Sequence, residues 1–188
     1  LYEETVKTLR NVSVTAPIIE IGTWRGGSTL MLMAALFKIY IETKQVFSIV
    51  TVDPYYFNVG TDEHGKFANF NIPYVDMLGT LAYATRISGV YQVHYKVTDH
   101  TYRNSVWYTP HYLGREPVSE PRFSLVHLDG GHEMGSEKEQ LEWFIPRIIP
   151  HGNILIDDVH DGREDKLKSW LLKNYGGHMV SKMEWVYK

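Results

Sequence analysis

Three aspartates follow two apolar stretches of the chain, at the point where each stretch ends. Asp129 comes after the run 123–128, and Asp157 and Asp158 come after the run 153–156. If the runs are neighbouring parallel strands in register, the three carboxylates meet at one edge of the sheet. Like charges at that distance are unfavourable unless they are protonated or bridged by a cation. The pattern predicts an oxygen-ligated site for Mg²⁺ or another divalent cation; the alternative is that Asp157 or Asp158 only caps the next helix.

A histidine lies close to these acids in the sequence. His132 is three residues beyond Asp129, and an imidazole, which titrates near neutral pH, can take a proton from a hydroxyl bound to a cation. We expect His132 to be this base, and the alternative is a capping or surface imidazole. His160 is a weaker candidate, whereas His127 lies inside the apolar run and is expected to be a core or edge residue.

A glycine-rich turn joins the first apolar run to a helical pattern. Residues 18–28 read IIEIGTWRGGS. Gly22, Gly26 and Gly27 allow a sharp turn and a close approach of a ligand to the main chain. The N–H groups of the helix start, with Ser28, favour a carboxylate or a phosphate. A purely structural turn is the alternative.

Two further acids lie on the apolar runs near this turn. Glu20 sits near the end of the first run, which is a costly place for a charge that binds nothing. Asp53 ends the second run, at the carboxyl edge where open α/β sheets bind their ligands, and an acid there suits the two hydroxyls of a ribose. Asp53 could instead be a turn residue before Pro54. Together these features predict an adenosine-containing ligand that carries an anion.

Short β-branched runs alternate with longer helical patterns along the chain, which is typical of βαβ units. The expected strands are 18–21, 47–52, 91–97, 123–128 and 153–156. The expected helices are 28–41, 74–87, 136–149 and 163–175. The pattern predicts an α/β, Rossmann-like, doubly wound and mostly parallel sheet with helices on both faces. We expect residues 179–187 to add a strand or hairpin, antiparallel to the rest.

Composition limits the class of protein. The 188 residues suit a single domain, 1–188, with loop insertions near 55–72 and 98–122 that are either binding loops or irregular surface loops. A net charge of −3 argues against nucleic acid as a partner, and the absence of cysteine excludes disulfides and thiolate chemistry. No apolar run is long enough for a membrane span. We expect a cytoplasmic protein, and aromatic side chains are compatible with a homo-oligomer.

The order of the motifs resembles that of class I S-adenosylmethionine-dependent methyltransferases. The segments EIGTWRGGS, VDPY, LDGGH and PHGNILIDD follow one another over most of residues 16–160. The chain looks similar to the metal-dependent O-methyltransferases, nearest to the macrocin and sugar O-methyltransferases, a group that includes proteins labelled cephalosporin hydroxylase. Its similarity to catechol O-methyltransferase-like enzymes is more distant.

This resemblance implies a role for each motif residue. The implied cofactor-binding residues are Glu20, Gly22, Thr23, Trp24, Gly26, Ser28, Asp53 and Thr98. Among them Glu20 corresponds to the acid near the methionine amino group, Ser28 to the hydroxyl near its carboxylate, and Asp53 to the acid that holds the ribose. Thr98 corresponds to the adenine side. The implied magnesium ligands are Asp129, Asp157 and Asp158, and His132 falls where the catechol-type enzymes place a lysine base.

One departure concerns the base. Some sugar O-methyltransferases carry an acid two residues after the first metal aspartate, and this chain has Gly131 there. The expected function is methyl transfer from S-adenosylmethionine to a hydroxyl of a small molecule or sugar, with Mg²⁺ or another divalent cation. Two alternatives are a non-catalytic cofactor-binding or scaffold protein of the same fold and a nicotinamide-dependent oxidoreductase.

Overall fold

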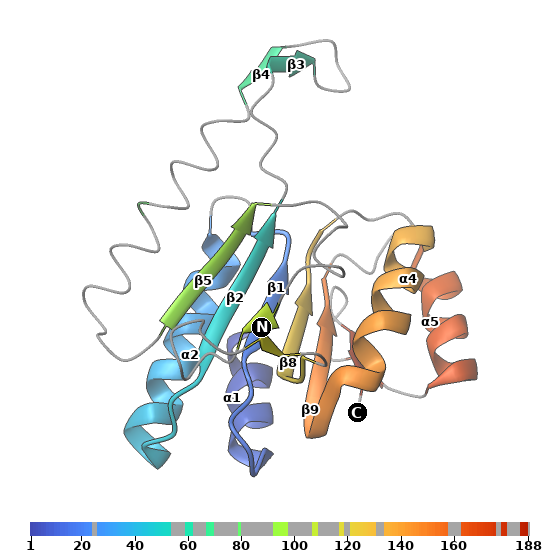
Figure 1. Ribbon diagram of the computed structural model, residues 1–188. Coiled ribbons are helices and arrows are strands. Elements are labelled where there is room, and N and C mark those ends of the chain that lie inside the picture. The colour runs from blue at the N-terminus through green and yellow to red at the C-terminus, as the bar shows by residue number, and fades with distance from the viewer. Residues whose placement is uncertain are drawn as a thin grey trace.

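The protein is described by a computed structural model, in which a central seven-stranded sheet has the strand order β10-β11-β9-β8-β1-β2-β5 (Figure 1). The structure describes residues 1–23, 26–53, 59–61, 67–69, 79, 92–97, 107–108, 117–118, 121–130, 134–157, 163–175, 178–179 and 185–187.

The strands of the central sheet are β1 (Ile18–Ile21), β2 (Ser48–Asp53), β5 (Gln92–Val97), β8 (Phe123–Leu128), β9 (Ile148–Ile156), β10 (His178–Met179) and β11 (Trp185–Tyr187). The pairs β5–β2, β2–β1, β1–β8 and β8–β9 are all parallel. The terminal strand β11 is antiparallel to both β9 and β10. The expected mostly parallel sheet, with an antiparallel strand or hairpin at the C-terminal end, is therefore confirmed, and two short strands, β10 and β11, are present there.

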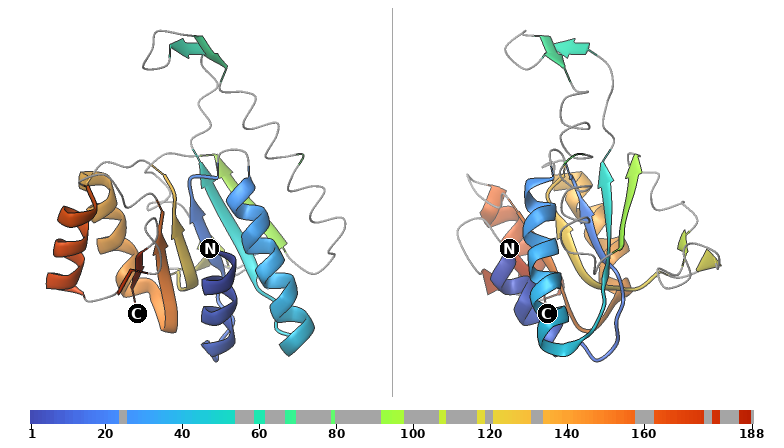
Figure 2. Two further views of the ribbon diagram at one scale, coloured as in Figure 1. Left: turned by 180° about the vertical axis from the view of Figure 1, so that it is seen from behind. Right: turned by 90° about the vertical axis from the view of Figure 1, so that its left-hand side faces the viewer.

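Helices cover both faces of the sheet, as expected for a doubly wound fold. They are α1 (Tyr2–Asn11), α2 (Gly27–Thr43), α4 (Met134–Phe144) and α5 (Arg163–Asn174). On one face, α1 and α2 bury Leu9 and Leu36 in a cluster with Ile18 of β1. On the other face, α4 and α5 pack with the opposite side of the strands, including Ile19 of the same β1. Seen from behind, α1 and α2 stand in front of the strands (Figure 2).

Helix α1 was not among the elements expected from the sequence. Its buried stripe contains Thr5 and Thr8 as well as Val6 and Leu9. The Thr5 hydroxyl donates to the Leu1 carbonyl at 2.9 Å. Two threonines on the inner face weaken the apolar periodicity that identifies an amphipathic helix.

The helix expected at 136–149 was wrong at its C-terminal end. Helix α4 stops at Phe144, a 3₁₀ turn, η3, covers Ile145–Arg147, and Ile148 already begins β9. Pro146 lies within η3 and has no N–H to continue an α-helical ladder. The apolar residues of this segment nevertheless face the core as their spacing indicates, because Ile145 and Ile148 pack against the same core cluster as Leu141 and Phe144.

The two segments expected as loop insertions each contain a short antiparallel pair. In the first, β3 (Val59–Thr61) pairs with β4 (Phe67–Asn69), and in the second, β6 (Trp107–Tyr108) pairs with β7 (Pro117–Val118). The helix expected at 74–87 lies outside the described residues except for residue 79. Among the helices in the described ranges, none has both the length and the apolar character to cross a bilayer.

Candidate active site

The carboxyl ends of four neighbouring strands are joined by main-chain hydrogen bonds. The Gly22 N–H donates to the Val52 carbonyl at 2.8 Å, and the Asp129 N–H donates to the Ile21 carbonyl at 2.8 Å. The Asp157 N–H donates to the Leu128 carbonyl at 2.9 Å. This ladder continues the sheet past its last assigned residues, so the residues that follow β1, β8 and β9 have fixed positions relative to one another.

Asp129 and Asp157 lie together at this edge, as the sequence predicts. With them lies His127 of β8, and one potential ligand atom from each of the three residues lies within 4.8 Å of the others. His127 and Asp129 are two positions apart, and alternate residues of an extended chain point to the same side. Both aspartates are half-buried, whereas His127 is only 1% exposed. The arrangement offers two carboxylates and one imidazole to a cation.

A buried carboxylate lies beneath this group. Glu20 of β1 is in register with His127 of β8 and is completely buried. One of its oxygens lies 3.3 Å from His127 Nδ1, and the other accepts a hydrogen bond from the Thr29 hydroxyl of α2. Within the described residues, both Glu20 oxygens thus have protein partners, and the carboxylate links α2 to the strand that carries Asp129.

The surroundings of His127 change the pKa of its imidazole. Burial alone would lower the pKa of this imidazole, but the hydrogen bond to Glu20 and the negative charges of Glu20, Asp129 and Asp157 outweigh it. The net result is a raised pKa for His127. The edge of the sheet is therefore a place of concentrated negative charge that favours a cationic group.

The glycine turn lies next to Asp129. Gly22 has φ +91°, and a Cβ at this position would overlap the Asp129 carbonyl oxygen. Gly26 has φ +83° and is the N-cap of α2, and its N–H donates to the Thr23 carbonyl at 2.7 Å. Glycine is thus required at position 22 by both backbone conformation and space.

This turn has properties that fit a small anionic ligand. Gly26 provides no side-chain hydrogen bond to the first N–H groups of α2, and such groups bind anions. The Thr23 hydroxyl is buried and has no hydrogen-bond partner in the described part of the chain. Ser28 is half-buried in the first turn of α2. These groups are hydrogen-bond donors that suit a carboxylate.

The other predicted site residues divide into two groups. Asp53 ends β2 at the same carboxyl edge, where it is in register with Val97 of β5. Trp24, Thr98, His132 and Asp158 lie outside the described residues, as do Gly131 and His160.

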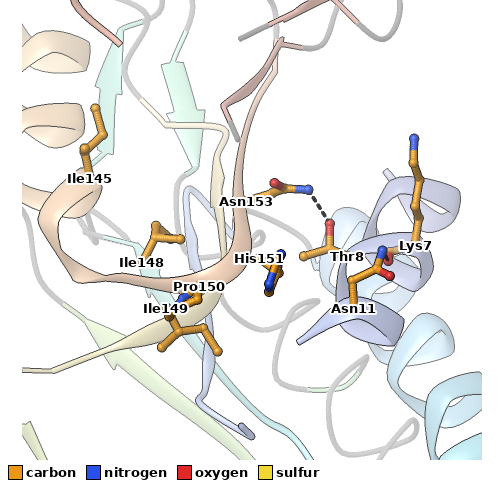
Figure 3. A pocket seen from close by; sticks show the side chains of 10 residues that line it. Lys7, Thr8, Asn11, Ile145, Ile148, Ile149, Pro150, His151 and Asn153 are labelled. Atoms are coloured by element: carbon orange, nitrogen blue, oxygen red, sulfur yellow. Dashed lines mark hydrogen bonds between the residues drawn. The ribbon is translucent and has the colours of Figure 1, made fainter. Parts of the chain in front are cut away.

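A cavity of about 610 Å³ lies elsewhere, between α1 and the start of β9 (Figure 3). Its lining includes Lys7 and Asn11 of α1 and Ile148, His151 and Asn153 of β9. Because this cavity borders the amino-terminal half of β9, it is at the opposite end of the strand from Asp157. Ligands of open α/β sheets bind outside the carboxyl ends of the strands, so we do not assign the cofactor to this cavity.

The fold is a Rossmann-like α/β fold with acidic side chains at the carboxyl edge of its sheet. A sequence model of the family described as a methyltransferase domain matches residues 19–159, which include most of β1, the glycine turn and all three acids predicted for the metal. The chain belongs to this family. Membership supports S-adenosylmethionine as the methyl donor and favours a methyltransferase over a nicotinamide-dependent oxidoreductase. No curated protein matches the chain.

Solved structures share the fold at low sequence identity. The calicheamicin methyltransferase CalS11 aligns with a TM-score of 0.63 and 15% identity, over 100% of this chain and 77% of that chain. Its apo structure, described as a TDP-rhamnose 3'-O-methyltransferase, aligns with a TM-score of 0.62 and 15% identity, over 100% and 78%. Precorrin-6y C5,15-methyltransferase from Geobacter metallireducens aligns with a TM-score of 0.54 and 9% identity, over 98% of this chain and 83% of that chain. These likenesses show the fold.

From the sequence, His127 is expected to be a core or edge residue and not part of the site. A single histidine inside an apolar strand is more often a core residue than a ligand, so its type alone carries little information. The position of His127 in its strand was the one informative feature. Glu20 lies two residues before Gly22, where the first chain segment leaves the sheet, and His127 lies two residues before Asp129, where the second one does. Parallel neighbours in that register place a carboxylate opposite an imidazole.

Proposed function

We propose that this chain is an S-adenosylmethionine-dependent O-methyltransferase that acts on a hydroxyl of a small molecule or sugar with the help of a divalent cation. The observation that carries the proposal is the meeting of Asp129, Asp157 and His127 within 4.8 Å, directly beside the glycine turn. One part of the site suits the methyl donor and the adjoining part suits a cation that would hold the acceptor.

Different residues of the chain would bind the donor and the cation. The turn from Gly22 to Ser28 would hold the methionine part of the donor, and Asp53 would accept hydrogen bonds from its ribose. Asp129, Asp157 and Asp158 would bind the cation and so fix the acceptor oxygen close to the methyl group. When bound, a divalent cation lowers the pKa of a hydroxyl that coordinates to it.

The transfer itself breaks the bond between sulfur and the methyl carbon and forms a bond between that carbon and the acceptor oxygen. The electron pair of the broken bond remains on sulfur, which becomes neutral as S-adenosylhomocysteine. We assign the removal of the hydroxyl proton to His132.

Calorimetric titration with S-adenosylmethionine tests the donor site, and we expect binding to well-folded protein. Transfer of a labelled methyl group to a panel of sugars and phenols, with and without EDTA, tests the acceptor class and the cation. We expect EDTA and Asp157→Asn each to reduce transfer at least about 100-fold while donor binding persists. Donor binding without transfer to any acceptor would instead indicate a non-catalytic member of the family, and unchanged transfer in EDTA would exclude the cation.

A further inference from the structure

We infer that His127 is a protein ligand of the divalent cation, and that Glu20 and Thr29 are positioning residues that hold its imidazole in place. This inference rests on the proposed function, because it concerns the cation of the same site. It adds one imidazole nitrogen to the carboxylate oxygens of the proposed cation site.

The distances fit a single ion. Two ligand atoms that each lie 2.0–2.2 Å from one cation are separated by roughly 3 to 4.4 Å, depending on the angle between them. The ligand atoms of His127, Asp129 and Asp157 lie within 4.8 Å of one another. This limit lies only slightly above the upper end of that range, so small movements of the side chains bring all three atoms within reach of one cation.

The surroundings of His127 provide the orientation that a ligand needs. Metal-bound histidines commonly donate their second ring N–H to a carboxylate, which fixes the tautomer and the plane of the ring. Glu20 lies 3.3 Å from Nδ1 of His127, which leaves Nε2 as the nitrogen for a cation. Thr29 donates to the second oxygen of Glu20, so the carboxylate is itself held from the other side.

All three residues in this series of contacts are buried, so their polar groups depend on one another as hydrogen-bond partners. Glu20, Thr29 and His127 are 0%, 0% and 1% exposed, and a buried carboxylate without partners is costly. An apolar residue at position 127 would suffice for packing, as Leu125 shows two residues earlier on the same strand. An imidazole between a buried carboxylate and two half-buried aspartates is instead the arrangement of a histidine ligand with its supporting carboxylate.

The donor set also predicts which cation binds best. Imidazole nitrogen suits Fe²⁺, Ni²⁺ and Zn²⁺, whereas Mg²⁺ and Mn²⁺ prefer oxygen ligands. We therefore expect the protein to bind Zn²⁺ at least about 10-fold more tightly than Mn²⁺, a preference in the direction of the general order of metal affinities and enlarged by the nitrogen ligand.

Pulsed electron paramagnetic resonance of bound Mn²⁺ tests the ligand directly in the wild-type protein. We expect nitrogen modulation of the Mn²⁺ signal, which shifts to the ¹⁵N frequency when histidine is labelled with ¹⁵N. We expect the modulation to disappear in His127→Asn and to persist in His132→Asn and His160→Asn. The matched control is His151→Asn, since His151 is an exposed histidine at the other end of β9 with φ +67°, a conformation that asparagine tolerates.

A second variant keeps the test decisive if His127→Asn fails to fold. Glu20→Gln preserves the shape of the side chain, and we expect it to retain the nitrogen modulation while Mn²⁺ affinity falls about 10-fold or more. Mn²⁺ binding without nitrogen modulation in the wild type, or modulation that persists in His127→Asn, would overturn the inference and leave the proposed function in place. If Mn²⁺ does not bind while S-adenosylmethionine does, the cation of the proposed function fails as well.

Discussion

The Glu20 carboxylate lies 3.3 Å from Nδ1 of His127, across two neighbouring strands and with both side chains withdrawn from solvent. Glu20 precedes the glycine turn on β1 and His127 precedes Asp129 on β8. The contact therefore joins the strand that leads to the glycine turn with the strand that leads to Asp129. A substitution of Glu20 or of His127 is therefore expected to affect the side chain of the other residue.

The first prediction concerns pH. The pKa of His127 is raised in the folded protein, so the proton on His127 stabilises the fold. That contribution is fully present below the unfolded pKa of about 6.5 and is lost as pH rises through the folded pKa. In metal-free protein we expect the difference in free energy of unfolding between wild type and His127→Asn to shrink above that pH. Urea unfolding across a pH series measures it.

The control for this pH series is His151→Asn, which changes an exposed histidine at the far end of β9. We expect its difference from wild type to stay constant with pH. A wild-type advantage over His127→Asn that grows with rising pH would show that the imidazole is buried in its neutral form.

The second prediction concerns the glycine turn. In Gly22→Ala the new methyl group would overlap the Asp129 carbonyl, and φ +91° is unfavourable for alanine. We expect a loss of at least about 2 kcal/mol in the free energy of unfolding, because backbone strain and a steric clash add together. Thermal and urea unfolding measure the loss. Gly27→Ala is the matched control, since a Cβ there meets no atom within 4 Å and alanine favours the start of α2.

Equal stability of the two alanine variants would contradict the close approach of Gly22 to Asp129.

The third prediction concerns the hydrogen bond from Thr29 to Glu20. Thr29→Val keeps the shape of the side chain but removes the donor from a fully buried carboxylate. We expect a destabilisation of about 1–3 kcal/mol, because the acceptor loses a partner that water cannot replace. Thr43→Val removes a hydroxyl that donates to the Ile39 carbonyl at 2.8 Å near the exposed end of the same helix. It should cost less than about 0.5 kcal/mol, and similar losses in both variants would argue against a special role for Thr29.

The fourth prediction concerns an ion pair between α1 and α2. Arg10 donates to both oxygens of Glu42, at 2.9 and 2.7 Å. This hydrogen bonding, helped by Lys38, lowers the pKa of Glu42 from 4.5 to about 2. The stabilisation is present above the unfolded pKa and is lost as pH falls toward 2.

Carbon-detected NMR titration of the Glu42 carboxyl measures this effect. We expect Arg10→Ala to move the pKa of Glu42 back toward its ordinary value. Because the pair is exposed, added salt should produce part of the same change. A pKa that Arg10→Ala leaves near 2 would assign the shift to Lys38 instead.

The arrangement of the sheet could be predicted from the sequence because its strands are short apolar runs that end in acids or glycine. Buried parallel strands have this pattern, and parallel pairing brings their ends to one edge. The adjacency of Asp129 and Asp157 follows from that rule alone. Gly22 could be recognised as a turn residue, but its contact with the Asp129 carbonyl depends on the spacing between two strands.

The role of His127 could not be predicted in the same way. The role of His127 depends on the register between β1 and β8, on the face of the sheet that its side chain occupies and on Glu20, which is 107 residues away in the sequence. Helix α1 was missed for a different reason, since Thr5 and Thr8 occupy buried positions that helical patterns usually assign to aliphatic residues. In both places a polar residue is inside the fold because a specific partner satisfies it.

No side chain fits between Gly22 and the Asp129 carbonyl, so main-chain atoms alone set the separation of the glycine turn from the acidic strand end. Substitutions of side chains at these strand ends can alter their charge, but they leave this separation of the two main-chain segments unchanged. Adaptation to a new acceptor is therefore expected in the connections that follow the strands, while the central pair of strands stays constant.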